Sequence, residues 1–314
     1  MSTLNKQIWL SAIQDNIYAE WDKLLQIATD DTPYVEKGAD GIYNTVYIPQ
    51  AGGVSQVKIN PNVYPLEVEE RVDDILSYTL KKIVQSPIRV GHYESKLNSY
   101  DDYRSILNDL IGNIGEAALY ETMKEWYIGK VSGGHVVTTG GNVTGGAPGA
   151  TGNRKSFTNA DFVKAVKTLD IQLNTRGVGE RIAILPTSMF YELHQDLFAA
   201  NINLRVMEND GIKMIEQPWL GCKIVTFPQV VVAANTGDVK SQITDASATT
   251  DIQVGLIVDK KAISVAKGDV QLFTNSGDAT YQGDILSSYT WVGGKYRRLD
   301  KKGVVPILQH ATGA

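Results

Sequence analysis

The glycine-rich stretch at residues 133–156 is the part of this 314-residue sequence whose residue types most suggest chemistry. It ends in Arg154, Lys155 and Ser156, and a lysine followed by a hydroxyl also ends the phosphate-binding loop of nucleotide enzymes. That loop needs a glycine directly before the lysine, so that backbone N–H groups can wrap the phosphates. Arg154 occupies this position, and the stretch follows a predicted helix instead of a buried strand. We therefore expect a flexible joint and no nucleotide site.

Three pairs of adjacent carboxylates have the residue types for acid–base catalysis. They are Glu69–Glu70, Asp73–Asp74 and Asp101–Asp102. Neighbouring side chains on one strand or helix point in different directions, so each pair is more simply explained as a solvated face or a helix cap. Ser188 and Ser264 lack the Gly-x-Ser-x-Gly setting of an activated serine.

The histidines and the single cysteine offer no stronger site. His92, His135, His194 and His310 show no metal-binding spacing. Cys222 alone can form neither an intramolecular disulfide nor a multi-cysteine zinc site, and it is expected to be a small buried hydrophobe. The sequence therefore predicts no catalytic residue, no cofactor and no metal site.

Composition narrows the class of protein further. The hydrophobic fraction of 43% and the charged fraction of 21% are typical of a folded soluble chain. The net charge is −5, without the clustered basic stretch that phosphate-directed nucleic-acid binding requires. No apolar run approaches 18 residues, and the first residues lack a secretory signal pattern. We expect no membrane contact and a location in a cytoplasm-like compartment, or in a particle assembled there.

Two segments of the first hundred residues look unable to bury themselves. Residues 4–28 predict an amphipathic helix with Trp9 and Trp21, which must be covered either by the same chain or by a neighbouring one. Residues 44–90 predict a long hairpin that begins with a strand at residues 45–48. Its middle holds too few apolar side chains to pack on itself. Such an arm is usually stabilised by lying on something else.

The rest of the chain predicts a mixture of helices and strands. The strongest helical periodicity covers residues 98–128, about 45 Å at 1.5 Å per residue. A second amphipathic helix opens at Thr158 and is followed by a strand at 181–186 and by a helix capped by Thr187. The C-terminal part predicts strands, ending in a hairpin that turns at Gly293 and Gly294. The fold class is α+β.

The order of these parts resembles that of the major capsid proteins of tailed bacteriophages, the Hong Kong 97 type. The resemblance covers essentially the whole chain and is clearest at residues 45–49, 99–128, 159–193 and 283–305. It implies a Hong Kong 97-like capsid fold with five parts. These are an N-terminal arm at 1–44, an extended β-hairpin loop at 45–90, a peripheral domain with a long spine helix at 91–134, an axial domain at 135–250, and a C-terminal β-rich segment at 251–314 that returns to both domains.

The same resemblance implies a structural function. Subunits of that family form hexamers and pentamers, which tile an icosahedral shell around double-stranded DNA. Partners would be further copies of the chain, a scaffolding protein, a portal and possibly a decoration protein, and the location would be a virion capsid assembled in the host cytoplasm. The residues expected to contact neighbouring subunits are Trp9, Trp21, Lys58, Glu67, Glu69, Glu70 and Asp73.

Some family members join their subunits covalently, through a lysine of the extended loop and an asparagine near the C-terminus. Lys58 could supply the lysine, but no asparagine follows Asn275, so this cross-link is not expected here. Two other classes remain open: an encapsulin-like cellular compartment that encloses a cargo enzyme, and a soluble enzyme without a recognisable site motif. Particle contents would distinguish the first alternative, and a small fixed oligomer with a polar pocket would indicate the second.

Overall fold

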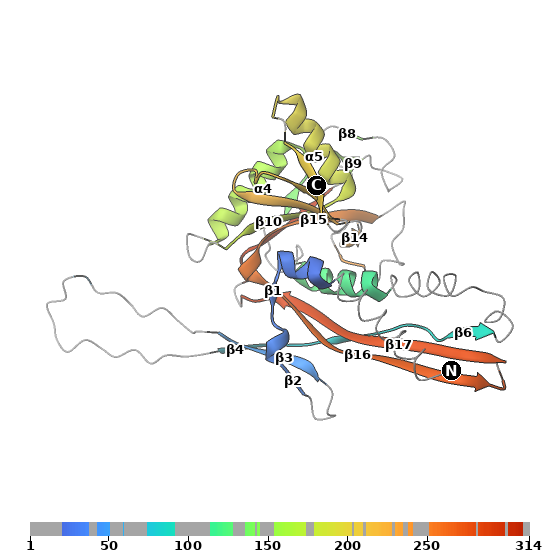
Figure 1. Cartoon of the computed structure of the whole chain (residues 1–314). Coiled ribbons are helices and arrows are strands. Elements are labelled where there is room, and N and C mark those ends of the chain that lie inside the picture. The colour runs from blue at the N-terminus through green and yellow to red at the C-terminus, as the bar shows by residue number, and fades with distance from the viewer. Residues whose placement is uncertain are drawn as a thin grey trace.

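The structure is a computed structural model of the whole chain. It describes residues 21–37, 43–50, 59, 74–91, 114–127, 136–141, 143–144, 154–173, 179–202, 204–209, 212–227, 230–234, 238–240, 251–280, 282–298 and 301–309. Figure 1 shows two main layers of strand: a mixed sheet flanked by helices in the upper half, and a long, narrow sheet that runs out from the lower half. The helical residues 21–27 and 114–126 lie between them.

The upper sheet has eight strands. Its order is β11 (Val206–Asn209), β12 (Ile212–Ile215), β13 (Cys222–Phe227), β10 (Arg181–Pro186), β15 (Asp251–Asp259), β18 (Val304–Leu308) and β7 (Val137–Thr138), with β14 (Val232–Ala234) paired to β15. The central strand β10 runs parallel to β13 and antiparallel to β15. A strand that is covered on both faces reads as a continuous apolar run, which explains the stretch Ile-Ala-Ile-Leu in β10.

Each face of this sheet has its own core. Helices α4 (Asn159–Leu173) and α5 (Thr187–Ala199) cover one face, where Ala183 and Leu185 of β10 point. Ile182 and Ile184 point the opposite way, into a core shared with Trp21 and with the helical residues 114–126. Side chains of β10 alternate between the two faces of the sheet. This strand therefore contributes to both cores, one with the upper helices and one with the layer below.

The lower sheet has five strands. It contains β1 (Thr29–Asp30), β16 (Ile263–Asp278), β17 (Gly283–Tyr296), β5 (Lys81–Val84) and β6 (Ile88–Gly91), the last two both paired to β17. The antiparallel pair β16–β17 forms the long ribbon at the bottom of Figure 1. Since β15 and β18 belong to the upper sheet, the C-terminal segment supplies strands to both sheets.

Two small sheets and two short 3₁₀ helices complete the described structure. The strands β2 (Val35–Lys37), β3 (Tyr43–Gln50) and β4 (Asp74–Thr79) form a three-stranded sheet, and β8 (Val143–Thr144) pairs with β9 (Arg154–Lys155). The 3₁₀ turns are η1 (Thr32–Tyr34) and η4 (Lys260–Ala262).

The predicted amphipathic helices bury an apolar face where the structure describes them, although Ala117 and Leu25 are only half-buried. In α4 the buried apolar face consists of Phe162, Val166, Leu169 and Leu173. In the helix that ends at residue 126, Ile114, Ala118, Met123 and Trp126 are buried. The earlier part of that predicted helix, residues 98–113, lies outside the described residues.

The predicted turn at Gly293 and Gly294 is wrong. Both glycines lie inside β17, opposite Ala266 and Val265 of β16. Instead of turning the chain, Gly294 lets a helix approach, because a Cβ there would lie 2.8 Å from the Trp126 indole nitrogen. The described part of the chain reverses between β16 and β17 at residues 279–282.

The cap predicted at Thr187 is also wrong. Thr187 is the first residue of α5 and Pro186 is its N-cap, with no side-chain capping hydrogen bond. The N-terminus of α4, in contrast, has a reciprocal cap. The Asp161 carboxylate accepts hydrogen bonds from the N–H and the hydroxyl of Thr158, and the Thr158 hydroxyl accepts one from the Asp161 N–H.

The glycine-rich stretch is tied to the upper sheet at its described ends, so the prediction of a plain flexible joint is corrected there. Val137 and Thr138 pair with β18, and the Gly140 N–H donates to the Asp161 carboxylate at 3.1 Å. Lys155 lies in strand β9, paired with Val143. A lysine in a strand does not have the strand–loop–helix setting of a phosphate loop, in agreement with the sequence-based exclusion of that site.

Candidate intersubunit surfaces

The base of the predicted hairpin is an antiparallel pair of strands. The register joins Thr45 to Thr79 and continues to Gln50 opposite Asp74. Val46, Ile48, Leu76 and Tyr78 point to one face and are buried together with Ala266 of β16. The residues between the two strands, 51–73, lie outside the described residues except for Ile59, whose side chain is 87% exposed.

The opposite face of this hairpin base carries two exposed apolar side chains among polar ones. The side chain of Tyr47 is 43% exposed and that of Ile75 is 61% exposed. They sit on adjacent antiparallel strands, Tyr47 opposite Ser77 and Ile75 opposite Pro49. This face is therefore available to another molecule, while the inner face fixes the base to the body of the subunit.

Of the seven residues that the sequence singled out for subunit contact, only Trp21 is described. Its side chain is 2% exposed and packs in the core with Leu24 and Met123. The chain itself covers this tryptophan and leaves almost none of its surface for a neighbouring subunit. The prediction that Trp21 contacts a neighbour is therefore wrong. The other six residues lie outside the described part of the chain: Trp9, Lys58, Glu67, Glu69, Glu70 and Asp73.

A charged cluster links β5 of the lower sheet to the helical residues 114–126. The ammonium of Lys81, the first residue of β5, contacts the carboxylates of both Glu121 and Glu125, with 3.1 Å to Glu121. Lys124 forms a second ion pair with Glu121 at 2.7 Å. Burial lowers the pKa of Lys81, but the two glutamates outweigh it and the pKa is raised. The glutamates are one helical turn apart, a spacing that sequence inspection could have identified.

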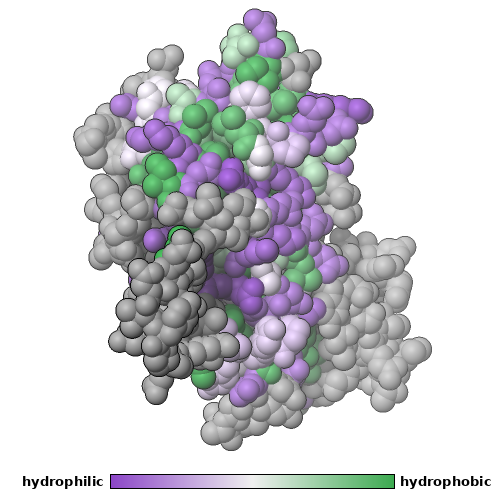
Figure 2. Space-filling model, turned by 90° about the vertical axis from the view of Figure 1, so that its left-hand side faces the viewer, coloured by the Kyte–Doolittle hydropathy of each residue, from purple (hydrophilic) through white to green (hydrophobic). Residues whose placement is uncertain are grey.

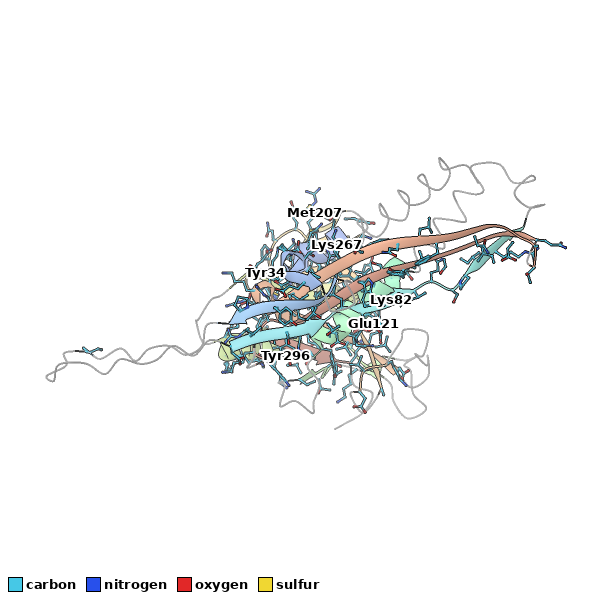
Figure 3. The ribbon with its side chains drawn as sticks, turned by 90° about the horizontal axis from the view of Figure 1, so that it is seen from below. Tyr34, Lys82, Glu121, Met207, Lys267 and Tyr296 are labelled. Carbon is cyan, nitrogen blue, oxygen red and sulfur yellow. The ribbon has the colours of Figure 1, made fainter. Side chains whose placement is uncertain are left out.

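Three aromatic side chains gather on the lower sheet beside Lys82, which is labelled in the view from below in Figure 3. Phe273 of β16 stacks on Tyr289 of β17 with ring centroids 5.5 Å apart, and Trp291 meets Tyr289 edge-on at 6.5 Å. The ammonium of Lys82 lies 4.0 Å from the Tyr289 ring centre, a cation–π geometry. Phe273 is 53% exposed. The sequence analysis missed this face, although the alternation of Tyr289 and Trp291 along β17 was a signal for it.

The upper part of the molecule carries further exposed apolar side chains. Tyr191 and Phe198 of α5 are 48% and 63% exposed, and Val206 and Met207 of β11 are 37% and 38% exposed. Figure 2 shows hydrophobic groups interspersed with hydrophilic ones over the upper part of one face. These positions are candidate contact sites, although each apolar area is broken by polar groups.

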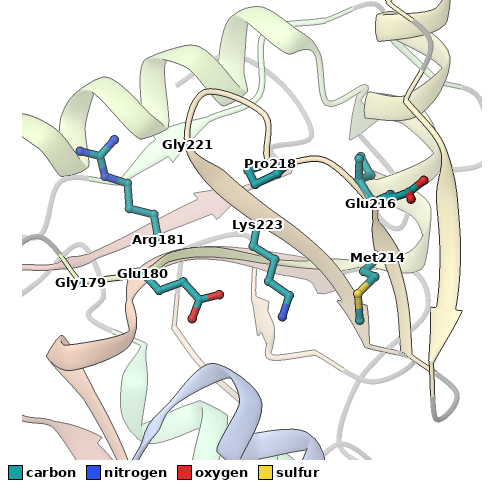
Figure 4. A pocket seen from close by; sticks show the side chains of 9 residues that line it. Gly179, Glu180, Arg181, Met214, Glu216, Pro218, Gly221 and Lys223 are labelled. Atoms are coloured by element: carbon teal, nitrogen blue, oxygen red, sulfur yellow. The ribbon is translucent and has the colours of Figure 1, made fainter.

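A pocket of about 390 Å³ opens beside the edge of the upper sheet. Glu180, Arg181, Glu216 and Lys223 line it, but Figure 4 shows Arg181 directed away from Glu180 and Lys223. The Arg181 guanidinium is instead paired with Asp170 at 2.9 Å. An enzyme site needs polar groups that converge on one point, and Arg181 is not directed toward the other charged groups of this pocket.

The candidate nucleophiles and bases have structural partners. The Ser188 hydroxyl is 3.2 Å from the Gln253 side-chain oxygen, and a His194 ring nitrogen is 3.2 Å from the Leu204 carbonyl. Cys222 is fully buried, and burial raises the pKa of its thiol to about 12, as predicted for an inert buried cysteine. Within the described ranges, no group of three or more His, Cys, Asp or Glu side chains is placed to hold a metal ion.

No helix in the described part of the chain is both long and apolar enough to cross a membrane.

Comparison with known proteins identifies the fold. No protein-family model and no curated protein matches the sequence. Among solved structures, the capsid of Ralstonia phage GP4 is similar with a TM-score of 0.58 and 13% identity, covering 91% of this chain and 88% of that one. The acidic stable capsid of Helicobacter pylori bacteriophage KHP30 gives a TM-score of 0.54 and 11% identity, covering 87% and 85%.

An encapsulin complex from Synechococcus elongatus PCC 7942 is similar as well, with a TM-score of 0.50, 11% identity, and coverage of 77% of this chain and 78% of that one. The chain therefore has the α+β capsid fold that the sequence predicted, and most of its structural neighbours are tailed-phage capsids.

Proposed function

We propose that this chain is the major capsid protein of a tailed bacteriophage, and that it assembles with copies of itself as hexamers and pentamers into an icosahedral shell around double-stranded DNA. The observation that supports this most is the likeness to a phage capsid over 91% of the chain. We also propose that the chain is a structural protein and not an enzyme, as its capsid neighbours are structural proteins.

The geometry of the hairpin base supports an assembly in which each subunit places its hairpin on a neighbouring subunit. Its inner face is fixed to the subunit, whereas Tyr47 and Ile75 on the outer face are exposed. Residues 51–73 connect its two strands in the sequence and include Glu67, Glu69 and Glu70. We propose that these carboxylates and Asp73 contact basic groups of the next subunit. Heterologous contacts of this kind close into rings.

The five parts expected from the family resemblance belong to the same proposal, with the boundaries given for the arm, loop, peripheral domain, axial domain and C-terminal segment. So do a scaffolding protein, a portal and a decoration protein as partners, assembly in the host cytoplasm, and contacts made by Trp9 and Lys58.

An encapsulin-like compartment is the second candidate function. The observation that favours it is the encapsulin complex, whose coverage of 77% of this chain places it among the structural neighbours. Both functions require a closed shell and differ in what the shell contains.

Two measurements test these functions. Light scattering and negative-stain microscopy of the purified chain should show rings, shells or tubes far larger than 34.4 kDa. A stable folded monomer at high concentration in every salt tested would contradict both functions. Particles isolated from the native source should hold nuclease-protected DNA if the chain is a phage capsid protein, whereas an enclosed enzyme without DNA would establish the encapsulin-like function.

A further inference from the structure

A buried carboxylate lies where three elements of the lower layer meet. Asp31 follows β1, and its N–H donates a 2.8 Å hydrogen bond to the Val265 carbonyl in β16. Arg297, directly after β17, and Tyr78, in β4 of the hairpin base, approach from two other elements. The Asp31 residue is 0% exposed. The junction therefore joins the N-terminal segment, the lower sheet and the hairpin base around one acidic side chain.

The charge of Asp31 is poorly compensated at this junction. Among the described residues, Arg297 is paired with it, with 3.3 Å between a guanidinium nitrogen and Oδ1. Neither carboxylate oxygen accepts a well-aligned hydrogen bond from the described residues, and Arg297 Nε is also buried without such a bond. Buried carboxylates are normally held by several hydrogen bonds, and a buried ion pair without them does not recover its cost of desolvation.

The neighbouring polar groups satisfy one another instead. The Tyr78 hydroxyl lies 3.3 Å from the Ser264 hydroxyl, which donates at 3.1 Å to the Lys295 carbonyl. Ser264 is still near enough to Asp31 to favour its charged form slightly. Tyr78 and Ser264 thus use their hydroxyl groups on each other and on the Lys295 carbonyl, and the Asp31 carboxylate lacks well-aligned hydrogen bonds from them.

The charged groups that face Asp31 act in opposite directions. Burial has the largest effect and raises the pKa of the Asp31 carboxyl; Arg297 opposes it, and the negative charge of Asp30 adds to it. Burial also raises the pKa of Tyr78, which stays protonated and neutral at ordinary pH. Lys267 of β16 interacts with Asp30 and Asp22, and its pKa is lowered by burial. Desolvation thus exceeds the attraction of Arg297.

We propose that Asp31 and Arg297 form an acid-responsive latch: uptake of one proton by Asp31 removes a poorly compensated buried charge and tightens the junction between the N-terminal segment and the hairpin base, and loss of that proton loosens it. The latch does not depend on the proposed capsid function. In a shell the junction would be looser above the folded pKa of Asp31 than below it.

The sign of the pH effect follows from linkage. The pKa of Asp31 in the folded chain lies above its value in the unfolded chain, about 3.9. Between these two values the folded state holds the proton and the unfolded state does not, so the Asp31 contribution to stability rises as the pH falls through this window. Above the folded pKa, the charged carboxylate is a constant cost.

Replacement of Asp31 by asparagine tests the latch, because the amide has the size of the protonated carboxyl and no charge. Thermal melting of the full chain is measured from neutral to acidic pH. Asp31→Asn should melt a few degrees above wild type at neutral pH, and the difference should shrink as wild-type Asp31 becomes protonated. Asp269→Asn is the control, since Asp269 is exposed on β16 and is not among the charged groups that act on Asp31, and it should not show this convergence. A neutral-pH melting temperature of Asp31→Asn at or below that of wild type would overturn the latch, and so would a difference that is the same at every pH.

A second measurement needs no variant. Hydrogen exchange of the wild-type Asp31 amide, which bonds to the Val265 carbonyl, is compared with that of the Thr139 amide, which bonds to the Leu308 carbonyl in the upper sheet. After correction for intrinsic exchange rates, protection of Asp31 relative to Thr139 should increase on acidification. Relative protection that is constant or falls would overturn the latch. Both measurements concern the subunit junction, so their outcome is separate from whether shells form.

Discussion

The indole N–H of Trp126 donates a 2.9 Å hydrogen bond to the backbone carbonyl of Ser264. This bond ties the last turn of the helix that ends at residue 126 to the middle of the lower sheet. It is possible because Gly294 of β17 lies beside the indole and has no side chain, since a Cβ at this position would collide with both hydrogen-bonding atoms. One glycine in a strand thereby sets how closely the helix packs on the sheet.

Gly294→Ala should destabilise the subunit by about 1–3 kcal/mol, the usual cost of overpacking a filled core. The added Cβ would lie 2.7 Å from the Thr122 methyl and 2.8 Å from the Ser264 carbonyl oxygen. Chemical denaturation followed by circular dichroism measures the change. Gly140→Ala is the control, because the nearest atom to its added Cβ is at an ordinary 3.4 Å. Equal effects of the two substitutions would show that the helix does not approach β17 this closely.

Phe162→Ala in α4 should cost about 3–5 kcal/mol, since a fully buried aromatic side chain is lost and a cavity remains. Val163→Ala is the matched control on the next residue, where the side chain is 41% exposed, and should change stability by no more than about 0.5 kcal/mol. The free energy of unfolding is the measured quantity. A reversed order would mean that α4 presents its other face to the upper sheet.

The apolar spacing of α4 could be predicted because burial of one helical face leaves a 3.6-residue pattern in the sequence. The same reasoning failed at Gly293 and Gly294. Two glycines between strand-like residues match a hairpin turn, and the actual reason for them is a helix from another part of the chain. The prediction that Trp21 contacts a neighbouring subunit failed for a similar reason, because the sequence does not show whether a neighbour or the same chain covers a tryptophan. The Asp31 junction joins residues far apart in sequence and left no local pattern.

Asp161→Ala should remove the cap of α4 and release the preceding segment. The Asp161 carboxylate accepts hydrogen bonds from the N–H groups of Thr158 and Gly140, so its loss leaves donors at two places unpaired. We expect a cost of about 1–2 kcal/mol and faster hydrogen exchange at Gly140. Thr168→Ala, an exposed hydroxyl inside the same helix, should be neutral. An unchanged rate of hydrogen exchange at the Gly140 amide would contradict the hydrogen bond from Gly140 to Asp161.

The Cys222 thiol should be unreactive in the folded chain. Its pKa is raised to about 12 by burial, and the thiolate is the form that reacts with alkylating agents. At pH 8 the folded protein should therefore resist iodoacetamide, and the same protein in denaturant should be alkylated at once. Intact-mass spectrometry measures both. Rapid alkylation without denaturant would show that β13 opens readily from the upper sheet.

The hairpin offers the most direct test of how subunits join. Residues 52 to 71 are replaced by a short Gly-Ser turn, which leaves β3 and β4 paired up to Gln50 and Asp74. The buried face of the hairpin base then remains complete, so the melting temperature and the circular dichroism spectrum should stay close to those of wild type. The removed residues include Glu67, Glu69 and Glu70, which we propose contact the next subunit.

The shortened chain should therefore fold but form no closed shells in negative-stain microscopy. A full-length chain with Glu67, Glu69 and Glu70 changed to glutamine is the matched control, because it keeps the hairpin and loses only its charge. If that control assembles and the shortened chain does not, shape and backbone contacts of the hairpin matter more than its charge. Shells of the shortened chain that match those of wild type would contradict the hairpin as an intersubunit arm, while the fold of the subunit would stand unchanged.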